Sequence, residues 1–221
     1  ERFMRRRALL SDEMPTELLE DVYEIPVRER GEATYRVYLF DVGTPTLVDA
    51  GFEDTVDVVR DACDDLGVAP ERLVVTHGDG DHVGGLPGLA AEFDLETYVP
   101  EGTDLPGGTA ADHRYGDRDE IGDFEAVHLP GHSADMHALV DESHDLAVLG
   151  DGVFGSDSRG LPPGYFVLPT AYYSDDLNAA DESLERLLDY EFEAGLVFHG
   201  SNVTEGARDK LDRFVNFANK S

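Results

Sequence analysis

The stretch THGDGDHVGG, residues 76–85, follows an apolar run and places four potential metal ligands within six positions: His77, Asp79, Asp81 and His82. In an extended chain, residues 77, 79 and 81 project to the same side, because side chains alternate along a strand. Asp81 and His82 are neighbours and diverge, so the stretch can serve two ions. Imidazole together with carboxylate suits zinc, iron or manganese. The pattern therefore predicts a metal site just after a strand.

A structural interpretation of the same stretch stays open at this point. Asp81 could instead cap a helix that begins near Val83, because aspartate is a preferred residue at helix N-termini. Gly78 and Gly80 fit either interpretation, since glycine permits unusual backbone angles and a close approach of the backbone. The metal interpretation requires further ligands elsewhere in the chain.

Three more polar residues stand at or after the end of an apolar run and before a small residue: His132 in PGHS, Asp151 in GDG and His199 in FHG. Each of them alone would be interpreted as a structural polar group with its hydrogen bonds satisfied. Together they repeat one arrangement, and open α/β sheets place their ligand sites at strand ends in this way.

The rest of the chain alternates short β-type runs with amphipathic helical patterns, which indicates packed α/β layers. We predict strands at residues 22–27, 33–40, 46–49, 73–76, 97–99, 126–129, 137–140, 146–149 and 195–199. We predict helices at residues 53–66, 84–93, 175–188 and 205–218. Two connections are longer than usual, as binding loops and lids often are, at residues 100–118 and 156–174.

A length of 221 residues, 41% of them apolar, fits one globular domain with a well-filled core. We divide the chain into an arm, residues 1–14, and a single domain, residues 15–221. Arginines cluster in the arm as at the start of a signal peptide, but the apolar segment that should follow them is missing. We therefore interpret the arm as flexible or artificially added.

The charge is strongly acidic, with 48 acidic and 17 basic residues and a formal net charge of −31. The excess spans the whole chain and predicts a protein of a halophile, adapted to a high-salt cytoplasm, because salt at about 1 M shortens the screening length to about 3 Å. A merely acidic protein with a polycationic partner is the alternative. Nucleic-acid binding is disfavoured because phosphate contacts need basic patches. No membrane partner is expected, since no apolar run approaches the ~20 residues of a membrane helix.

The single cysteine, Cys63, rules out intrachain disulfides and thiolate zinc knuckles. It shares one face of the predicted 53–66 helix with Val56, Val59 and Leu66, so we predict that it is a small core residue.

The ordered series of motifs resembles the metallo-β-lactamase superfamily. The matching positions are, in chain order, Asp49-Ala50-Gly51, residues 77–82, Pro130-Gly131-His132, Gly150-Asp151 and His199-Gly200. The resemblance covers nearly all of the chain. It implies a four-layer αββα sandwich, in which two mixed β-sheets are flanked by helices.

The resemblance also implies a centre of two divalent metal ions. The ligands it implies are His77, Asp79 and His132 for the first ion, Asp81, His82 and His199 for the second, and Asp151 as the bridge between them, beside a bridging hydroxide. Asp49 would support the ligand loop from outside. An ordinary turn residue before Gly51 is the alternative for Asp49.

Asp79 departs from the family pattern, which usually has histidine at this position. Flavin-linked di-iron members carry a carboxylate there, so a ligand role is still implied. With Asp81, Asp151 and a hydroxide, Asp79 would cancel the charge of two divalent ions, whereas a histidine would leave one positive charge. The extra carboxylate shifts the preference from zinc, the expected metal, toward manganese or iron. Alternatively, Asp79 does not ligate and the first site is weak or empty.

Such a centre predicts a metal-dependent hydrolase that cleaves a small ester, lactone or thioester, because paired ions lower the pKa of bound water and polarise a carbonyl oxygen. We expect Asp81 and Asp151 to be the catalytic residues, with Asp81 passing a proton to the leaving group. Zinc β-lactamases generally lack the bridging aspartate, so Asp151 argues against that activity. A di-iron redox protein and a non-catalytic metal-binding module of the same fold stay open as alternatives.

The substrate is a small molecule on this interpretation. The loop at residues 156–174 offers candidate contacts to it: Arg159, Tyr165, Tyr172 and Tyr173. Packing of the loop by these aromatic side chains is the alternative.

Overall fold

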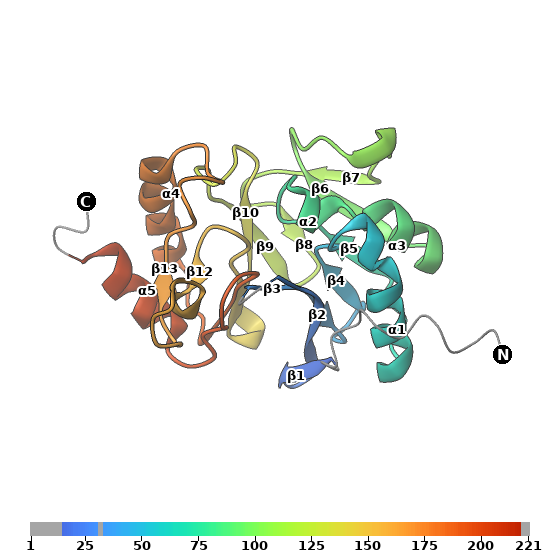
Figure 1. Cartoon of the computed structure of the whole chain (residues 1–221), viewed down its shortest axis with the longest axis horizontal. Helices are drawn as coiled ribbons and strands as arrows, with labels where there is room; N and C mark the ends of the chain where they lie inside the picture. The colour runs from blue at the N-terminus through green and yellow to red at the C-terminus, as the bar shows by residue number, and fades with distance from the viewer. Residues whose placement is uncertain (1–14, 31–32, 218–221) are drawn as a thin grey trace.

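Two β-sheets packed face to face form the middle of the molecule, and helices cover both outer faces (Figure 1). The computed structural model describes residues 15–30 and 33–217, so the predicted arm at residues 1–14 lies outside the described residues. The first sheet follows the order of the sequence: β1 (Thr16–Leu19), β2 (Val22–Arg30), β3 (Ala33–Phe40), β4 (Thr46–Val48), β5 (Arg72–Val74), β6 (Glu96–Pro100) and β7 (His113–Tyr115).

The second sheet has the order β14 (Ala194–Leu196), β11 (Leu146–Val148), β10 (His137–Asp141), β9 (Phe124–His128) and β8 (Glu120–Ile121). Both sheets are mixed. In the first sheet β1 to β4 pair antiparallel and β4 to β7 parallel, and in the second sheet β11 and β14 form a parallel pair. A separate small ribbon joins β12 (Phe154–Gly155) to β13 (Phe166–Val167).

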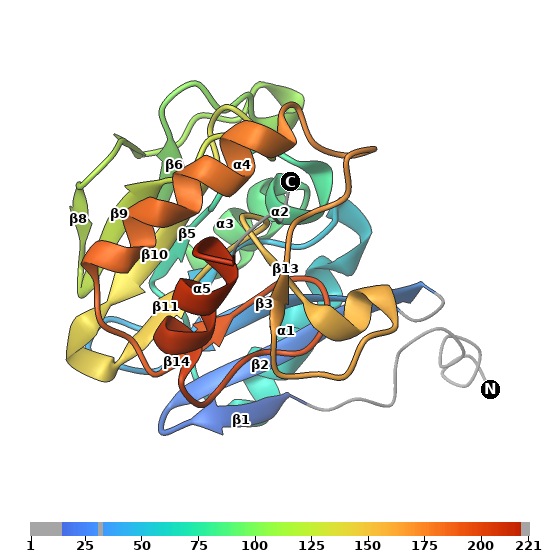
Figure 2. The ribbon, with the colours of Figure 1, turned by 90° about the vertical axis from the view of Figure 1, so that its left-hand side faces the viewer.

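The helices fall into two groups. The first sheet is covered by η1 (Glu53–Thr55), α1 (Val56–Leu66), α2 (Gly80–Val83) and α3 (Leu86–Phe93). Figure 2 shows the second group lying across the other sheet: α4 (Leu177–Ser183), which continues into η5 (Leu184–Asp189), and α5 (Ala207–Val215). Single 3₁₀ turns occur at η2 (Pro106–Gly108), η3 (Glu142–His144) and η4 (Ser156–Arg159).

The alternation of side chains along β3 shows how three apolar layers arise. Tyr38 and Phe40 point between the two sheets, whereas Val37 and Leu39 point toward α1 and α3. A third apolar cluster lies between the second sheet and α4, η5 and α5. This order of helix, sheet, sheet and helix confirms the predicted αββα sandwich. Cys63 is fully buried in α1 among apolar side chains, which confirms its prediction as a core residue.

Each strand predicted from an apolar run is present, but the helix bounds differ from the predicted ones. The predicted helix at 84–93 is α3, which begins at Leu86, and a separate short helix that was not predicted, α2, precedes it at Gly80–Val83. The residue before α2 is Asp79, so the interpretation of Asp81 as a helix cap is wrong. No helix in the described part of the chain is both long and apolar enough to span a membrane.

Candidate metal centre

Parallel strand pairing brings ligands together from distant parts of the sequence. In the β11–β14 pair, Val148 lies opposite Leu196, and Asp151 and His199 each follow three residues later. Asp151 and His199 therefore lie at the same end of the sheet. The loop after β5 brings His77 to the corresponding end of the first sheet.

The segment around α2 holds its ligands through a close backbone contact. The backbone N–H of Ala50 donates to the carbonyl of His82 at 2.8 Å, which ties the end of β4 to the first turn of α2. A Cβ atom at Gly85 would lie 2.1 Å from the carbonyl oxygen of Ala50. Glycine at this position therefore allows the approach that fixes Asp81 and His82.

His132 is held by the start of α4. The backbone N–H groups of Asp175 and Asp176 donate to the carbonyls of His132 and Gly131, at 3.0 and 2.9 Å. Gly131 has φ of +142°, and a Cβ atom there would lie 2.0 Å from the backbone nitrogen of Ala180. The Pro-Gly-His motif thus needs its glycine both for the backbone angle and for the close contact with α4.

In the first ligand group, His77, His132 and Asp151 converge, and the partly exposed Asp79 lies beside the two histidines. The Nε2 atom of His132 lies 3.1 Å from Oδ2 of Asp79 and 3.5 Å from Oδ2 of Asp151, and Nε2 of His77 lies 3.6 Å from Oδ2 of Asp79. Ligand atoms placed tetrahedrally at about 2.1 Å from a zinc-sized ion are separated by about 3.4 Å. These separations are therefore those of donors that surround one ion.

The second group shares Asp151 with the first. Nε2 of His199 lies 3.3 Å from Oδ2 of Asp151 and 3.6 Å from Oδ2 of Asp81. Nε2 of His82 lies 3.6 Å from Oδ1 of Asp151 and 3.8 Å from Oδ2 of Asp81. Asp151 thus faces histidines of both groups, which is the position expected of a bridging carboxylate.

Several possible metal-ligating atoms of the centre are buried without a hydrogen-bond partner in the described part of the chain. Nε2 of His77, Nε2 of His82 and Oδ1 of Asp151 are buried, and none of them has a hydrogen-bond partner within the described residues. An unsatisfied buried polar atom costs about 1–3 kcal/mol. Their convergence on two clusters with carboxylate and imidazole donors fits a pair of divalent ions that these donors would ligate.

Asp49 orients one of the ligands from behind. Its carboxylate is fully buried and accepts hydrogen bonds from the backbone N–H of Thr76 at 2.6 Å, from Oγ1 of Thr76 at 2.7 Å and from Nδ1 of His82 at 2.6 Å. When Nδ1 of an imidazole donates in this way, Nε2 carries the lone pair that a metal requires. Asp49 therefore sets the tautomer of His82.

The electrostatics of the centre favour cations. Burial disfavours the protonated form of His82, but the carboxylates of Asp49, Asp151 and Asp81 outweigh it and raise its pKa well above the ordinary value. Burial likewise opposes ionisation of Asp151, yet the neighbouring histidines hold its pKa well below the ordinary value. The hydrogen bond from His132 and the nearby imidazole of His77 lower the pKa of Asp79. Ionised carboxylates therefore dominate a buried cluster that attracts positive charge.

A cavity of about 330 Å³ opens directly onto this cluster. Its floor contains Asp79, Asp81, His132, Asp151 and His199. Its walls come from the β2–β3 hairpin, from Phe52 and Phe154, and from the predicted binding loop at 156–174. A small substrate can reach the candidate ligands through this opening. The other long loop, at residues 100–118, contributes no residue to the lining of the cavity.

The candidate substrate contacts divide into two pairs. Arg159 and Tyr173 line the cavity. Tyr165 and Tyr172 do not line it and are 60% and 87% exposed. Tyr165 lies near the ammonium group of Lys210, and the ring of Tyr172 packs against that of Tyr173.

The sequence analysis missed two aromatic residues of the wall, Tyr35 and Phe52. Their rings lie 5.2 Å apart, and the ring of Tyr35 also meets that of His199 at 5.0 Å. Burial and the charge of Asp81 raise the pKa of the Tyr35 phenol, while Arg30 opposes the rise. Tyr35 lies in a strand pattern and Phe52 follows Asp49-Ala50-Gly51, so neither position carried a signal for a site of its own.

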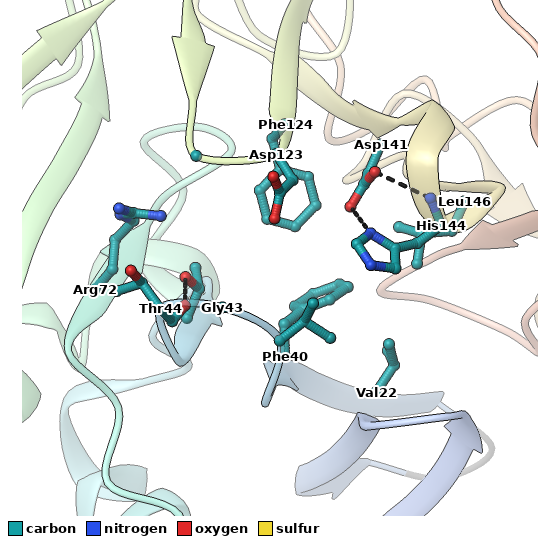
Figure 3. A pocket seen from close by; sticks show the side chains of 13 residues that line it. Val22, Phe40, Gly43, Thr44, Arg72, Asp123, Phe124, Asp141, His144 and Leu146 are labelled. Atoms are coloured by element: carbon teal, nitrogen blue, oxygen red, sulfur yellow. Dashed lines mark hydrogen bonds and ion pairs between the residues drawn. The ribbon is translucent and has the colours of Figure 1, made fainter.

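A second cavity, of about 260 Å³, lies at the opposite end of the sandwich, where β4, β5 and β11 begin (Figure 3). Asp123, Asp141 and His144 meet there and form a third group of possible ligands. Asp141, however, already accepts hydrogen bonds from Ser143 and His144 and caps η3. This arrangement is that of a helix cap. Unlike the first two groups of possible ligands, the third contains no buried polar atom that lacks a hydrogen-bond partner among the described residues.

Comparison with known proteins gives a consistent result. A family model described as the metallo-beta-lactamase superfamily matches residues 31–194. An atrochrysone carboxyl ACP thioesterase of Claviceps purpurea is 24% identical over 188 residues, which are 79% of this chain and 54% of that protein. A hydroxyacylglutathione hydrolase of Bdellovibrio bacteriovorus is 31% identical over 141 residues, which are 61% of this chain and 51% of that protein.

The chain spans about half the length of these curated relatives. Among solved structures, a protein crystallised in a di-iron-bound form is similar with a TM-score of 0.66 and 25% identity, covering 86% of this chain and 98% of that one.

Proposed function

The chain belongs to the metallo-β-lactamase superfamily, and on this premise we propose that it is a metal-dependent hydrolase that cleaves a small thioester, ester or lactone at a dinuclear centre. The observation that carries the proposal is the position of Asp151, whose two carboxylate oxygens face histidines of both ligand groups. A carboxylate shared by two ligand groups fits two neighbouring ions that it would join, whereas a single ion would leave one of the groups without a metal.

The ligands would divide between the ions as the side chains cluster. His77, Asp79 and His132 would hold one ion, Asp81, His82 and His199 the other, and Asp151 would join them. Ions bound there would supply Lewis acidity, which lowers the pKa of water and stabilises negative charge on a substrate oxygen. The metal preferred by this set is zinc, with manganese or iron favoured by the additional carboxylate of Asp79.

The residues around the ions would direct the substrate. Asp81 lines the cavity, and we assign to its carboxylate the transfer of a proton to the leaving group. Arg159 and Tyr173, which line the same cavity, would contact the substrate. The aromatic side chains of Phe52 and Phe154, which line the cavity, would pack against the acyl group.

Thioesters are the first substrate class to test, because the similar proteins are described as an acyl carrier protein thioesterase and a hydroxyacylglutathione hydrolase. Metal-free protein would be reloaded with zinc, manganese or ferrous iron and assayed with thioesters, esters and lactones that share one acyl group. We expect hydrolysis that appears only with metal and saturates at two ions per chain.

The replacement Asp151→Ala tests the shared carboxylate. We expect it to abolish hydrolysis and metal pairing while the fold persists, because the apolar layers supply most of the buried area. Asp141→Ala is the matched control, since both carboxylates are 3% exposed and lie in the same half of the sandwich. Near-wild-type turnover and metal content in Asp151→Ala would contradict the dinuclear mechanism.

A di-iron redox protein is the second candidate, favoured by the carboxylate at Asp79 and by the similar structure crystallised with two irons. Iron content after purification and a visible absorption spectrum that changes on reduction would support it. Hydrolysis with zinc at undiminished rate would support the hydrolase instead.

A further inference from the structure

Two side chains that line the cavity already donate hydrogen bonds to the protein. Oγ of Ser158 donates to the carbonyl of Gly155 at 2.6 Å, and Nη2 of Arg159 donates to the carbonyl of Leu168 at 2.9 Å. By contrast, the hydroxyl of Tyr35 makes no hydrogen bond to any described residue. The phenol therefore has its donor available for a molecule in the cavity.

Three other donors line the cavity, and they are placed less firmly. Arg30 is exposed at the end of β2, and Tyr173 is 70% exposed. Thr170 lies in the loop between β13 and α4. Tyr35 differs from them because it belongs to a central strand of the sheet.

Two aromatic contacts fix the ring of Tyr35. Its ring lies 5.2 Å from that of Phe52 and 5.0 Å from that of His199, with interplanar angles of 61° and 90°. The guanidinium of Arg28 covers Phe52 at 4.0 Å from the ring centroid. The phenol is thus held against one of the candidate ligands by a packed wall, which limits the positions its hydroxyl can take.

The strand that carries Tyr35 is also bonded to the loop that carries His199. The buried guanidinium of Arg36 donates to the carbonyl of Val197 at 3.0 Å, and the hydroxyl of Tyr38 donates to the same carbonyl at 2.5 Å. These bonds join β3 to the loop after β14 and fix the strand that carries Tyr35 against the loop that carries His199. A donor preorganised in this way needs no rearrangement when charge develops beside it.

We propose that the Tyr35 phenol donates a hydrogen bond to the carbonyl oxygen of the substrate as that oxygen becomes negatively charged. The inference rests on the proposed hydrolase function and adds a catalytic residue to it. When water adds to the carbonyl carbon, the electron pair of the carbonyl bond moves to the oxygen, and the phenol stabilises that charge while keeping its proton. When the carbonyl bond re-forms, the thiolate or alkoxide leaves with the electron pair of the broken bond and takes up the proton that the attacking water gave to Asp81.

The test compares Tyr35→Phe with Tyr23→Phe. Both changes remove one hydroxyl from a partly buried tyrosine that packs against the same apolar cluster, but Tyr23 does not line the cavity. A hydrogen bond to a charged group contributes about 1.5–3 kcal/mol, so we expect kcat/KM of Tyr35→Phe to fall by about 10- to 100-fold. KM and metal content should stay within about two-fold, because the lost bond forms mainly in the transition state.

Two comparisons separate this role from others. A thioester and an oxoester with the same acyl group should lose rate by the same factor, because their carbonyl oxygens gain the same charge. A phosphonate, whose tetrahedral anion resembles the charged intermediate, should bind Tyr35→Phe more weakly in calorimetry by a similar factor. This binding experiment stays informative even if the loaded protein hydrolyses none of the substrates, so failure of the proposed function is distinguishable.

Three results would overturn the inference. The first is a kcat/KM of Tyr35→Phe within two-fold of that of Tyr23→Phe. The second is unchanged phosphonate affinity. The third is a loss confined to the oxoester and growing with the pKa of its leaving group, because it would show that the phenol protonates the leaving group instead.

Discussion

Replacing Asp49 by asparagine should weaken metal binding without disturbing the backbone. Asp49 has φ of +63°, a left-handed conformation that asparagine tolerates about as well as aspartate. Its carboxylate accepts three hydrogen bonds, two from Thr76 and one from Nδ1 of His82. An asparagine side chain has one acceptor oxygen and one donor NH₂ group. In either orientation of the amide, its NH₂ group therefore faces a group that was donating to the carboxylate.

The two orientations have different costs but the same consequence for the ions. If the NH₂ group faces His82, the imidazole must shift its proton to Nε2, and the lone pair that would bind the ion is lost. If the NH₂ group faces Thr76, two N–H groups oppose each other in a fully buried place, and the loop that carries His77 is displaced. Loss of a residue that orients a metal ligand typically lowers metal affinity about 10- to 100-fold, or about 1.4–2.8 kcal/mol.

The measurement is competition with a chelator for each bound ion, together with the thermal unfolding of metal-free protein. Asp112→Asn is the matched control, because Asp112 accepts hydrogen bonds from the backbone N–H and Oγ1 of Thr97 at 2.9 and 2.7 Å but meets no candidate ligand. Both variants should lose some stability, and Asp49→Asn alone should lose metal affinity. Equal metal affinity in the two variants would refute the assignment of Asp49 as the residue that sets the tautomer of His82.

Four further predictions concern Asp79, the surface charge and Cys63. Asp79→Ala should weaken one of two binding events by at least about 10-fold in calorimetry, because the other ion keeps three ligands and the bridge; two unchanged events would mean that Asp79 is not a ligand. Asp79→His should raise the affinity for zinc relative to manganese, since imidazole is the softer ligand, and an unchanged ratio would contradict this. The melting temperature should rise from low salt to molar KCl, because the screening length falls from about 10 Å at 0.1 M to about 3 Å at 1 M, and a flat response would show that repulsion among the −31 net charges is unimportant. Burial raises the pKa of the Cys63 thiol to about 12, so a thiol reagent should label it only after unfolding; labelling of the native protein at neutral pH would contradict its place in the core.

The strands that are apolar runs were predictable, because such a run of four to eight residues is itself a signal for a buried strand. The strands β1 and β7, which are partly exposed, were not predicted. The bounds of α2 were not, because its four residues lie within the ligand stretch and have no amphipathic period of their own. The short strands β8, β12 and β13 have two residues each, too few for an alternating pattern. Their pairing depends on neighbours that only the folded chain supplies.

The candidate ligands could be picked out from the sequence, but their arrangement in space could not. That Asp151 stands beside His199 follows from the parallel register of β11 and β14, in which Val148 lies opposite Leu196. A shift of one residue in this pairing would turn the side chains to opposite faces of the sheet. Nothing in the residues around Asp151 specifies that register, which is set by the packing of the whole second sheet.

Tyr35 shows why residues of the cavity wall are harder to predict than the ligands. Its strand pattern demands only an apolar or aromatic side chain, and its ring indeed packs against the core shared with α1 and α3. The contact with His199 arises because Arg36 and Tyr38 bond a loop about 160 positions later in the sequence. A candidate ligand is recognisable because few structural roles need a histidine after a strand. A tyrosine in a strand, by contrast, is explained by packing alone. Catalytic roles of such residues therefore become visible only when the second sheet has placed its loops against the first.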